Sequence, residues 1–590
     1  MKEFVKYVFA TVLGIFLFLG IIMLFGVMSI IGMVASGEQT KGVDDNSVLV
    51  MKLSGMMEER GTSDFLSALT GQATDAYGLD QMISAVKKAK DNDEIKGIYI
   101  EAGAFAPDSY ASLQELRREL ADFRKSGKWI VAYGDMYTQP TYYLASVANK
   151  VWLNPQGQVD WHGLAAEKQY FKGLLEKFGV KMQVAKVGSY KSAVEMFSGE
   201  KMSDADREQT QAYIDGIWQN VTRDVAASRK ISVDRLNILA DSLITFATPE
   251  DLLREHMVDA LIYTDQVKAE VKKMLKIDSD EDISQLTIAD MNNVKGKKKR
   301  GDQVAVYYAC GDIVDGAVGN LLNKENVIDA QKVCKDLEKL MNDDDVKAVV
   351  LRVNSGGGSA YASEQIWHQM MELKAKKPVV VSMGGMAASG GYYISAPADW
   401  IVAEPTTLTG SIGIFGMFPD MSGLLTEKLG IKFDEVKTNK HSAFGTQARP
   451  FTDEEMKYLE AYIERGYKLF RNRVASGRPL TVEQVEAVAQ GHVWLGQDAL
   501  KIKLVDQLGN LDDAISKAAT LAKLKEYHSE AYPAPADWTE QLLSKVQGGS
   551  YLDDQMRLAL GDYYAPLMFI KTINNQSAIQ ARIPYFIHVK

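Results

Sequence analysis

The chain has only two cysteines, Cys310 and Cys334, among its 590 residues. One disulfide bond is arithmetically possible, but lone thiols in apolar patterns are more typical of buried packing residues, and the spacing fits no metal site. A strong positive charge is also missing, because the formal net charge is -10 and the one clear basic run spans residues 295–300. This charge balance argues against a nucleic-acid partner. We therefore predict no bound metal, no cofactor and no nucleic acid.

Charged residues are absent from residues 7–37, a run of 31 positions rich in Leu, Ile, Phe, Val and Met. As a helix, this run would be about 46 Å long, which exceeds the roughly 30 Å hydrocarbon core of a bilayer. A cleaved signal peptide has a shorter apolar core of about 7–15 residues, so the run predicts an uncleaved transmembrane anchor, although Val34-Ala35-Ser36 could be a cleavage site. Because Lys2 and Lys6 precede the run, residues 38–590 are expected on the extracytoplasmic (periplasmic) side of the inner membrane.

The two halves of the chain repeat each other at an offset of about 250 residues, which indicates a duplicated unit. Three short matches carry the offset: Tyr110-Ala111-Ser112 with Tyr361-Ala362-Ser363, Tyr142-Tyr143 with Tyr392-Tyr393, and Gly173-Leu174-Leu175 with Gly423-Leu424-Leu425. The chain is also too long for one ordinary core. We divide it into a tip, anchor and stalk (1–46), an N-terminal unit (47–273), a polar linker (274–301), a C-terminal unit (302–523) and a C-terminal extension (524–590).

Short apolar runs alternate with longer amphipathic segments in each unit. In the first unit, residues 97–100 and 129–133 are predicted strands, and residues 112–123 are a predicted helix. Each unit then ends in a long predicted helix, residues 204–229 and 453–476, that could carry contacts with other units. The alternation predicts an α/β fold with largely parallel strands. Residues 525–590 predict little beyond a helix and a strand-like end at residues 583–589.

Residues 378–416 of the second unit carry the strongest chemical signal. A β-branched run at Val379–Val381 and the helix-like segment after Gly390-Gly391 predict a strand, a tight turn and a helix, with Ser389 at the turn. The N–H groups of a first helical turn could stabilise an oxyanion if Ser389 attacks a carbonyl. The glycines at 356–358 could supply a further N–H. Alternatively, both glycine clusters are only turns.

The repeat fails at these two places. Opposite Ser389-Gly390-Gly391 the first unit has Gln139-Pro140-Thr141, and opposite the triple glycine it has Ala104–Pro107. Only the second unit therefore has the residues expected for acyl transfer.

Ser389 needs a proton acceptor, because a free serine hydroxyl is a poor nucleophile. The sequence has no G-x-S-x-G elbow, and none of its seven histidines stands in a recognisable triad pattern. In the first unit, Lys191 follows a strand-like segment at residues 182–185. From its local sequence alone, Lys191 is most simply a solvated surface lysine.

Several segments together resemble the signal peptide peptidase A (protease IV) family in its long, membrane-anchored, duplicated form. Besides the anchor, these segments are Gly188–Glu195 (GSYKSAVE), Arg352–Ser359 (RVNSGGGS), Met386–Tyr393 (MAASGGYY) and Thr409–Gly413 (TGSIG). The resemblance implies a Ser/Lys-dyad endopeptidase of the Clp-protease/crotonase fold. It also implies a bowl-shaped homotetramer that degrades hydrophobic signal peptides after their release from preproteins.

The resemblance also implies roles for individual residues. Ser389 would be the nucleophile, Lys191 the general base, Ser411 the hydroxyl that orients the lysine, and Gly390 and Gly358 the oxyanion N–H donors. The chain departs from the family at Gly356, where proline is usual, and this change loosens the loop.

The dyad has a clear physical requirement, because a lysine is a base only when it is neutral. Lowering its pKa from about 10.4 toward 7 costs roughly 4–5 kcal/mol of ammonium desolvation, which burial between two units could provide. Two other functions compete: a crotonase-type acyl-CoA enzyme, which would need neither Ser389 nor Lys191, and a non-catalytic membrane scaffold built on a decayed protease.

Overall fold

The computed structural model describes residues 41–61, 77–296, 299–316, 327–534 and 578–583, together with scattered positions between 6 and 21. The predicted anchor at residues 7–37 therefore lies outside the described residues, apart from those scattered positions. No helix in the described ranges is long and apolar enough to cross a bilayer.

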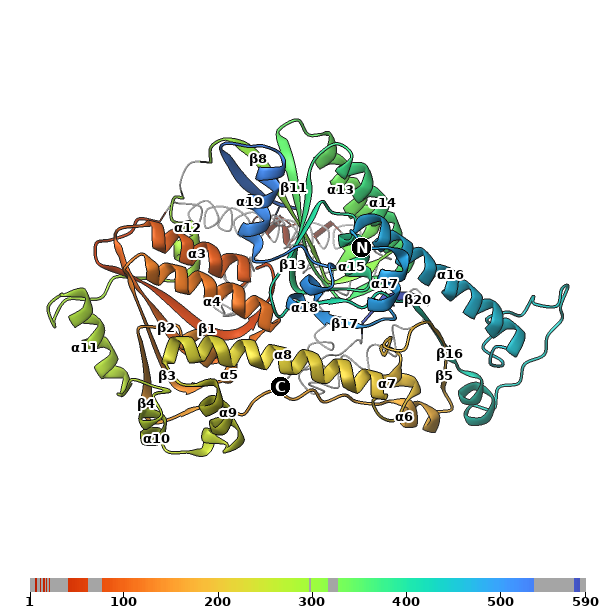
Figure 1. Ribbon diagram of the computed structural model, residues 1–590, viewed down its shortest axis with the longest axis horizontal. Coiled ribbons are helices and arrows are strands. Elements are labelled where there is room, and N and C mark those ends of the chain that lie inside the picture. The colour runs from red at the N-terminus through yellow and green to blue at the C-terminus, as the bar shows by residue number, and fades with distance from the viewer. Residues whose placement is uncertain are drawn as a thin grey trace.

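The first unit is built on a parallel sheet with the strand order β6-β4-β3-β2-β1-β7 (Figure 1). Its strands are β1 (Ser47–Met57), β2 (Ile95–Pro107), β3 (Trp129–Tyr137), β4 (Lys150–Val159), β6 (Ala260–Leu261) and β7 (Gln285–Leu286). Buried side chains point to both faces of the sheet, because Leu49 and Met51 join one core cluster and Val48 joins another. This two-sided burial is typical of a parallel sheet covered by helices on both faces.

The helices of the first unit lie on both sides of its sheet, apart from the two short helices at residues 172–177 and 195–198, which pack beside residues 181–186. They are α3 (Leu79–Asp91), α4 (Tyr110–Lys125), α5 (Gln139–Ala145), α6 (Lys172–Lys177), α7 (Glu195–Ser198), α8 (Asp204–Arg229), α9 (Val233–Asp241), η1 (Ile244–Phe246), α10 (Pro249–Arg254), α11 (Thr264–Leu275) and α12 (Ile288–Asn293). Residues of α3 and α4 pack in the larger core cluster, whereas Val267 and Val271 of α11 pack on the opposite face.

The second unit repeats this architecture, with the strand order β17-β15-β13-β11-β8-β19 and with β14 and β18 attached beside β13. Its strands are β8 (Asp302–Cys310), β11 (Val346–Ser355), β13 (Val379–Ala388), β14 (Trp400–Ala403), β15 (Leu408–Gly410), β17 (Val493–Leu495), β18 (Gln507–Leu508) and β19 (Tyr527–Tyr532). Its helices are α13 (Ala330–Asn342), α14 (Ala360–Lys374), α15 (Gly390–Ser395), η2 (Leu424–Lys428), α16 (Asp453–Gly477), α17 (Val482–Val488), α18 (Gly496–Lys501) and α19 (Leu511–Leu521).

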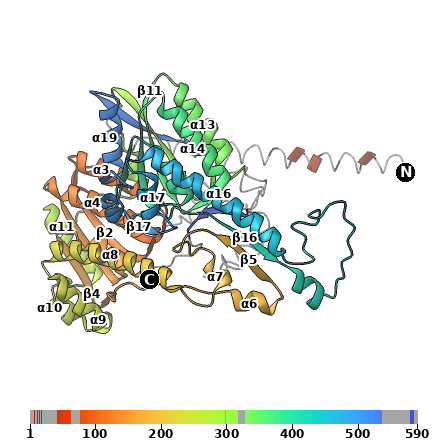
Figure 2. The same ribbon diagram turned by 45° about the vertical axis from the view of Figure 1, so that its right-hand side comes forward.

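A third sheet joins the two units, with the order β10-β9-β12-β20-β16-β5. Its strands are β5 (Lys181–Lys186), β9 (Asp312–Val314), β10 (Val327–Asp329), β12 (Gly357–Ser359), β16 (Phe415–Asp420) and β20 (Ile579–Arg582). Strand β5 of the first unit runs antiparallel to β16 of the second, and the two lie side by side in Figure 2. This sheet lies next to the catalytic candidates. Strand β12 contains Gly357 and Gly358 of the triple glycine, and β16 begins shortly after Ser411.

Helix α8 also spans both units. In Figure 1 it runs along the lower side, from the first sheet to beneath the second unit. Asn220 of α8 donates to Gln497 over 3.1 Å, and the Cβ that Gly216 lacks would lie 2.2 Å from Leu495. The two units therefore share packed surfaces rather than a flexible hinge.

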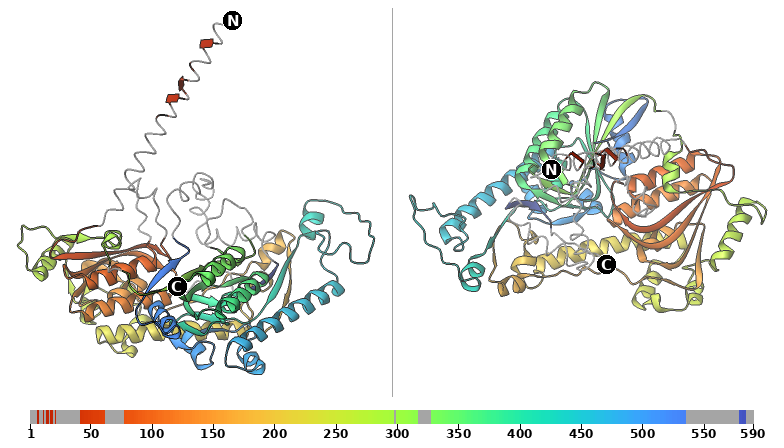
Figure 3. Two further views of the ribbon diagram at one scale, coloured as in Figure 1. Left: turned by 90° about the horizontal axis from the view of Figure 1, so that it is seen from above. Right: turned by 180° about the vertical axis from the view of Figure 1, so that it is seen from behind.

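Helix α16 projects from the body of the second unit, as Figures 1 and 3 show. We call residues 421–477, which run from the end of β16 through α16, the arm. It carries many exposed apolar side chains: Leu429, Ile431, Phe433, Val436, Phe444, Tyr458, Tyr462 and Leu469.

The predicted secondary structure is confirmed where the pattern was strongest. The strands predicted at residues 97–100 and 129–133 lie in β2 and β3, and the predicted helices lie in α4, α8 and α16. The segment expected to be a linker, residues 274–301, instead contributes β7 and α12 to the first unit. β7 pairs with β1, and Leu286 and Ile288 are buried in its core, which a count of polar residues could not reveal.

Candidate active site

Lys191 and Ser389 meet between the two units, although they lie 198 positions apart in the chain. The Lys191 Nζ atom is 2.7 Å from the Ser389 Oγ atom. Nζ is also 3.0 Å from the Oγ atom and 3.1 Å from the carbonyl oxygen of Ser411. The structure thus brings three of the residues singled out in the sequence into one hydrogen-bonded group.

Strand β13 positions Ser389. The strand continues through Gly384-Gly385 and ends at Ala388, so the chain turns at Ser389 itself, just before α15. Ser389 has φ 54° and ψ -112°, a strained conformation for a residue with a side chain. Its N–H donates to the Gly410 carbonyl over 2.8 Å, which helps to fix this turn against β15.

Lys191 is buried, with 1% of its surface exposed, and Ser389 is fully buried. Burial removes the water that stabilises an ammonium ion, and it holds the pKa of Lys191 well below its usual value. The contacts of Nζ are hydroxyl and carbonyl oxygens rather than carboxylates. A neutral amine has two N–H groups and one lone pair, so it can donate to both Ser411 oxygens while its lone pair faces the Ser389 hydroxyl.

The first unit delivers Lys191 on a short segment that docks against the second unit. The Tyr190 N–H donates to the Gln490 carbonyl over 3.0 Å. Gly491 has φ +82°, and a Cβ at this position would lie 2.7 Å from the Cα of Lys191. Only a glycine permits this close approach in this backbone conformation.

Residues beyond this contact hold the same segment. The Gln209 side chain of α8 donates to the Tyr190 carbonyl and to the Ser192 hydroxyl, both over 3.1 Å, and accepts from the Val493 N–H over 3.1 Å. Gln209, Gln490 and Gly491 are functional-site residues that the sequence analysis missed. Their signal would have been weak, because a single Gly or Gln has many other uses.

Gly358 and Gly390, predicted as oxyanion donors, come from β12 and from the first position of α15. Gly357, between β11 and Gly358, has φ +100°, and a Cβ there would lie 2.7 Å from the Gly390 nitrogen. The triple-glycine segment and the N–H of Gly390 are therefore close neighbours. Gly357 N–H itself donates to the Ser355 hydroxyl over 3.1 Å, so it has another partner.

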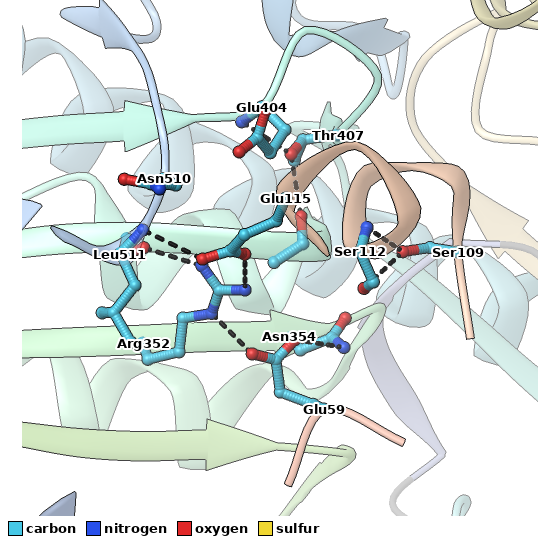
Figure 4. Close-up of polar contacts among 12 residues, drawn as sticks. Glu59, Ser109, Ser112, Glu115, Arg352, Asn354, Glu404, Thr407, Asn510 and Leu511 are labelled. Carbon is cyan, nitrogen blue, oxygen red and sulfur yellow. Dashed lines mark hydrogen bonds and ion pairs between the residues drawn. The ribbon is translucent and has the colours of Figure 1, made fainter. Parts of the chain in front are cut away.

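A buried ionic cluster ties the first unit to the strand that carries this loop (Figure 4). Arg352 of β11 is 1% exposed and donates to Glu59 and to Glu115, each over 2.7 Å. Asn354, two residues further on, donates to Glu59 over 3.1 Å and accepts from the Met386 N–H over 3.1 Å. Burial raises the pKa of Glu59 to about 7.

The cluster explains the two glycines within β13. A Cβ at Gly384 would lie 2.6 Å from the Glu59 carboxylate, and one at Gly385 would lie 2.5 Å from the Ser109 hydroxyl. Side chains of the first unit thus press against the strand that leads to Ser389. Breaking such a buried pair leaves an uncompensated charge, so the cluster makes docking of the two units specific to one position.

Cys310 and Cys334 are both free thiols, each partly buried. Burial raises the pKa of both, so neither is activated as a nucleophile. His441, which stands opposite Lys191 in the repeat, lies in the arm beside Glu454 rather than near Ser389. These side chains take no part in the group around Ser389.

Comparison with known proteins agrees with the duplicated architecture. The model of peptidase family S49 matches residues 122–278 and 371–525, one segment in each unit, and the model of the Clp protease family matches residues 318–401. A protein named Protease 4 from Salmonella typhi is 38% identical over 550 residues, which cover 90% of this chain and 87% of that protein.

Two further relatives match over most of their length. A Protease 4 from Haemophilus influenzae is 34% identical over 525 residues, covering 85% of this chain and 83% of that protein. The chloroplastic serine protease SPPA of Arabidopsis thaliana is 31% identical over 488 residues, covering 82% and 70%. With one match in each unit and relatives of nearly full length, the chain belongs to peptidase family S49 and is a serine protease built from a tandem duplication.

Proposed function

We propose that this protein is a membrane-anchored endopeptidase in which Ser389 is the nucleophile and Lys191 the general base. The observation that carries the proposal is the 2.7 Å contact between Nζ and Oγ, made by a lysine whose burial lowers its pKa. A neutral amine at this position can accept the serine proton as Oγ attacks the peptide carbonyl carbon.

The same amine serves both halves of the reaction. After the attack, the Lys191 ammonium returns the proton to the leaving amine, and the C–N bond breaks to give an acyl-enzyme on Ser389. A water molecule then gives a proton to Lys191 while its oxygen attacks the acyl carbon. Collapse of this second intermediate breaks the bond to Oγ, which takes the proton back, and it releases the carboxylate product.

Ser411 orients the lysine in this scheme. Its hydroxyl oxygen and its carbonyl oxygen accept the two N–H groups of the neutral amine, so the lone pair of the amine faces Ser389. Gly390 and Gly358 supply the N–H groups that stabilise the developing oxyanion, a role for which fixed backbone donors are well suited.

The proposed location and substrate follow from the N-terminal sequence. Residues 7–37 are uncharged and long enough to span a bilayer, and two lysines precede them, so the catalytic units are proposed to lie on the periplasmic side of the inner membrane. An enzyme held there meets hydrophobic peptides in or near the membrane, and released signal peptides are the proposed substrates.

The arm supports association between copies of this chain, and the proposed assembly is a homotetramer. Its exposed apolar side chains gather on a projection of the second unit, and such side chains are typical of surfaces that another subunit covers. Helix α8, which corresponds to α16 in the repeat, is instead packed across both units of its own chain.

The substrate proposal is tested by comparing an extended hydrophobic peptide with a compact, stable protein that contains the same sequence. We expect the peptide to be hydrolysed and the folded protein to be spared, and Ser389→Ala to abolish hydrolysis. Rapid digestion of the folded protein would contradict the substrate class but would leave the catalytic group intact.

The anchor is tested by carbonate extraction of membranes and by adding protease to spheroplasts. We expect the full-length chain to stay in the membrane pellet and residues after 38 to be accessible from outside. Recovery of a soluble protein that begins near Ser36 would show instead that the apolar run is removed.

A further inference from the structure

One turn of the second unit, just before β17, holds the backbone of both segments that form the proposed base. The Gln490 carbonyl accepts from the Tyr190 N–H over 3.0 Å, and the His492 carbonyl accepts from the Ser411 N–H over 2.7 Å. Gln490 has φ 58° and Ser411 has φ 49°, values that are uncommon for residues with side chains. Such conformations persist only where the surrounding contacts hold them in place.

The side chain of His492 contacts two aromatic rings, one from each unit. Its ring centroid is 4.3 Å from that of Tyr190 and 3.9 Å from that of Trp494. The His492 and Trp494 planes differ by 20° and stack, whereas the His492 and Tyr190 planes are tilted by 52°. All three side chains are half-buried. Ring contacts of this kind contribute about 0.5–1.5 kcal/mol beyond the area they bury.

Both ends of this aromatic group are anchored. The Trp494 indole N–H donates to the Val488 carbonyl over 2.9 Å, and Trp494 pairs with Thr409 of β15, the strand that leads to Ser411. On the first unit, the Tyr190 hydroxyl donates to Glu208 of α8 over 3.2 Å. The His492 ring therefore connects a side chain fixed in the second unit to the residue that directly precedes Lys191.

The His492 ring is neutral at neutral pH. Its Nδ1 atom is 2.9 Å from the Val493 carbonyl oxygen, which can only accept, so the neutral ring has its proton on Nδ1. Burial lowers the pKa of His492, and the Glu208 carboxylate is the charged group that opposes this effect. A neutral ring packs against its two neighbours without the desolvation cost of a charge.

The position of Tyr190 controls the enclosure of the neighbouring lysine. Lys191 is 1% exposed, and backbone of the second unit lies close along its side chain. The Cβ that Gly491 lacks would be 2.7 Å from the Lys191 Cα, and the one that Gly413 lacks would be 3.2 Å from the Lys191 Cδ. This enclosure lasts only while the two units stay in contact at this turn.

We propose that His492 is a positioning residue, whose ring packs on Tyr190 and Trp494 and thereby keeps the segment around Lys191 closed against the second unit and keeps water away from the amine. The ring acts through Tyr190 and Lys191 rather than on the reacting atoms. This inference rests on the proposed function, in which Lys191 is the general base. Without the ring, water reaches the amine and stabilises its protonated form.

The test measures kcat/KM against pH for an extended fluorogenic peptide with the full-length protein. In His492→Ala, we expect the rising limb to move about one pH unit higher, because solvation favours the Lys191 ammonium. At a pH on this limb, kcat/KM should fall about tenfold, while the plateau at high pH should stay within about threefold of the wild-type value. Tyr190→Ala removes the other ring and should move the limb equally, and the double variant should be no worse than either.

Two further substitutions separate the ring of His492 from its N–H group. His492→Phe keeps an aromatic ring and should restore the wild-type limb, whereas His492→Gln keeps an N–H donor and should behave like His492→Ala. The matched control is His368→Ala, because His368 is an exposed histidine of α14, and it should leave the profile unchanged.

Two results would overturn the inference. If His492→Ala lowered kcat/KM by the same factor at every pH, the ring would have a structural role without an effect on the base. If His492→Phe were as impaired as His492→Ala, packing of an aromatic ring would not be what holds the segment.

Hydrogen exchange separates this inference from the proposed chemistry. In the Ser389→Ala background, adding His492→Ala should make the Tyr190 amide exchange about tenfold faster, with exchange in β2 unchanged as evidence of an intact fold. Adding His492→Phe should leave the Tyr190 rate unchanged. An unchanged rate in His492→Ala would contradict the positioning role and leave the dyad intact. Faster exchange together with an active Lys191→Ala enzyme would support the placement of the segment and contradict the proposed base.

Discussion

Replacing either Lys191 or Ser389 with alanine is expected to lower kcat by about 10⁴- to 10⁶-fold, and replacing both should be scarcely worse than replacing one. The reason is that the two groups act on one proton: without the base the hydroxyl stays protonated, and without the hydroxyl the base has nothing to activate. Non-additive losses of this kind distinguish a catalytic unit from two residues that contribute independently.

Two companion variants sharpen this prediction. Lys191→Arg should fail as severely as Lys191→Ala, because a guanidinium does not give up its proton at any working pH. Ser411→Ala should cost only about 10- to 100-fold, as expected for a group that orients another. Circular dichroism and melting curves show whether each variant is folded. A folded Lys191→Ala enzyme with near-normal kcat would mean that another base serves Ser389.

The second large effect is expected on changing pH. The protonated form of Lys191 cannot accept the Ser389 proton, so kcat/KM should rise about tenfold per pH unit until the lysine is neutral and then level off. Because burial lowers the pKa of Lys191, the plateau should begin well below pH 10.5 and activity should be lost as pH falls through the lowered pKa.

Glu59 provides a necessary control for the pH profile. Its pKa is raised to about 7, and through Asn354 it contacts the segment that leads to the glycine loop. Glu59→Gln removes this titration while the lysine remains. If the rising limb survives in Glu59→Gln at the same pH, it belongs to Lys191. A limb that disappears with Glu59 would assign the pH dependence to the ionic cluster instead.

Lys191 should also make stability depend on pH. The unfolded chain binds a proton at this lysine up to about pH 10.4, whereas the folded chain does so only below the lowered pKa. Between these two values the unfolded state holds more protons, so stability rises with pH. Lys191→Met should remove this contribution to the rise of the unfolding free energy with pH. The loss of the contribution would show that burial of the basic lysine lowers the stability of the fold.

The parts of this fold that local sequence could predict are those with a regular pattern. The period of apolar residues located β2, β3, α4, α8 and α16, and the repeated short motifs located the duplication. The strand and the turn around Ser389 could also be predicted, because β13, the turn and the start of α15 are each formed by residues that are neighbours in the sequence.

Contacts between distant segments could not be derived in this way. Lys191 looks like a surface lysine in its own segment, and its burial depends on Gly491 and Ser411 of the other unit. Only the resemblance to a family pointed to it. The same holds for Arg352 with Glu59 and Glu115, and for Gln209, whose partners are more than 200 residues away or lie on another element.

The place of β20 illustrates the same limit. Residues 579–582 (IQAR) form a short stretch with weak strand character, and nothing in their sequence indicates that they pair with β12 and β16. The strand-like end predicted at residues 583–589 lies outside the described residues apart from Ile583. The position of β20 is fixed by its pairing with β12 and β16 beside the active-site glycines. These two strands become neighbours of the segment only when the chain has folded.

Catalysis in this proposal depends on the activation of Ser389 by buried Lys191. The most direct measurement is the rate at which a fluorophosphonate labels Ser389 in the wild-type protein and in Lys191→Met, followed across pH with the labelled residue identified by mass spectrometry. We expect the wild-type rate to rise with pH through the lowered lysine pKa, and the variant to react about 10³-fold more slowly with no such rise. Labelling of folded Lys191→Met at the wild-type rate, with an unchanged pH dependence, would contradict the claim.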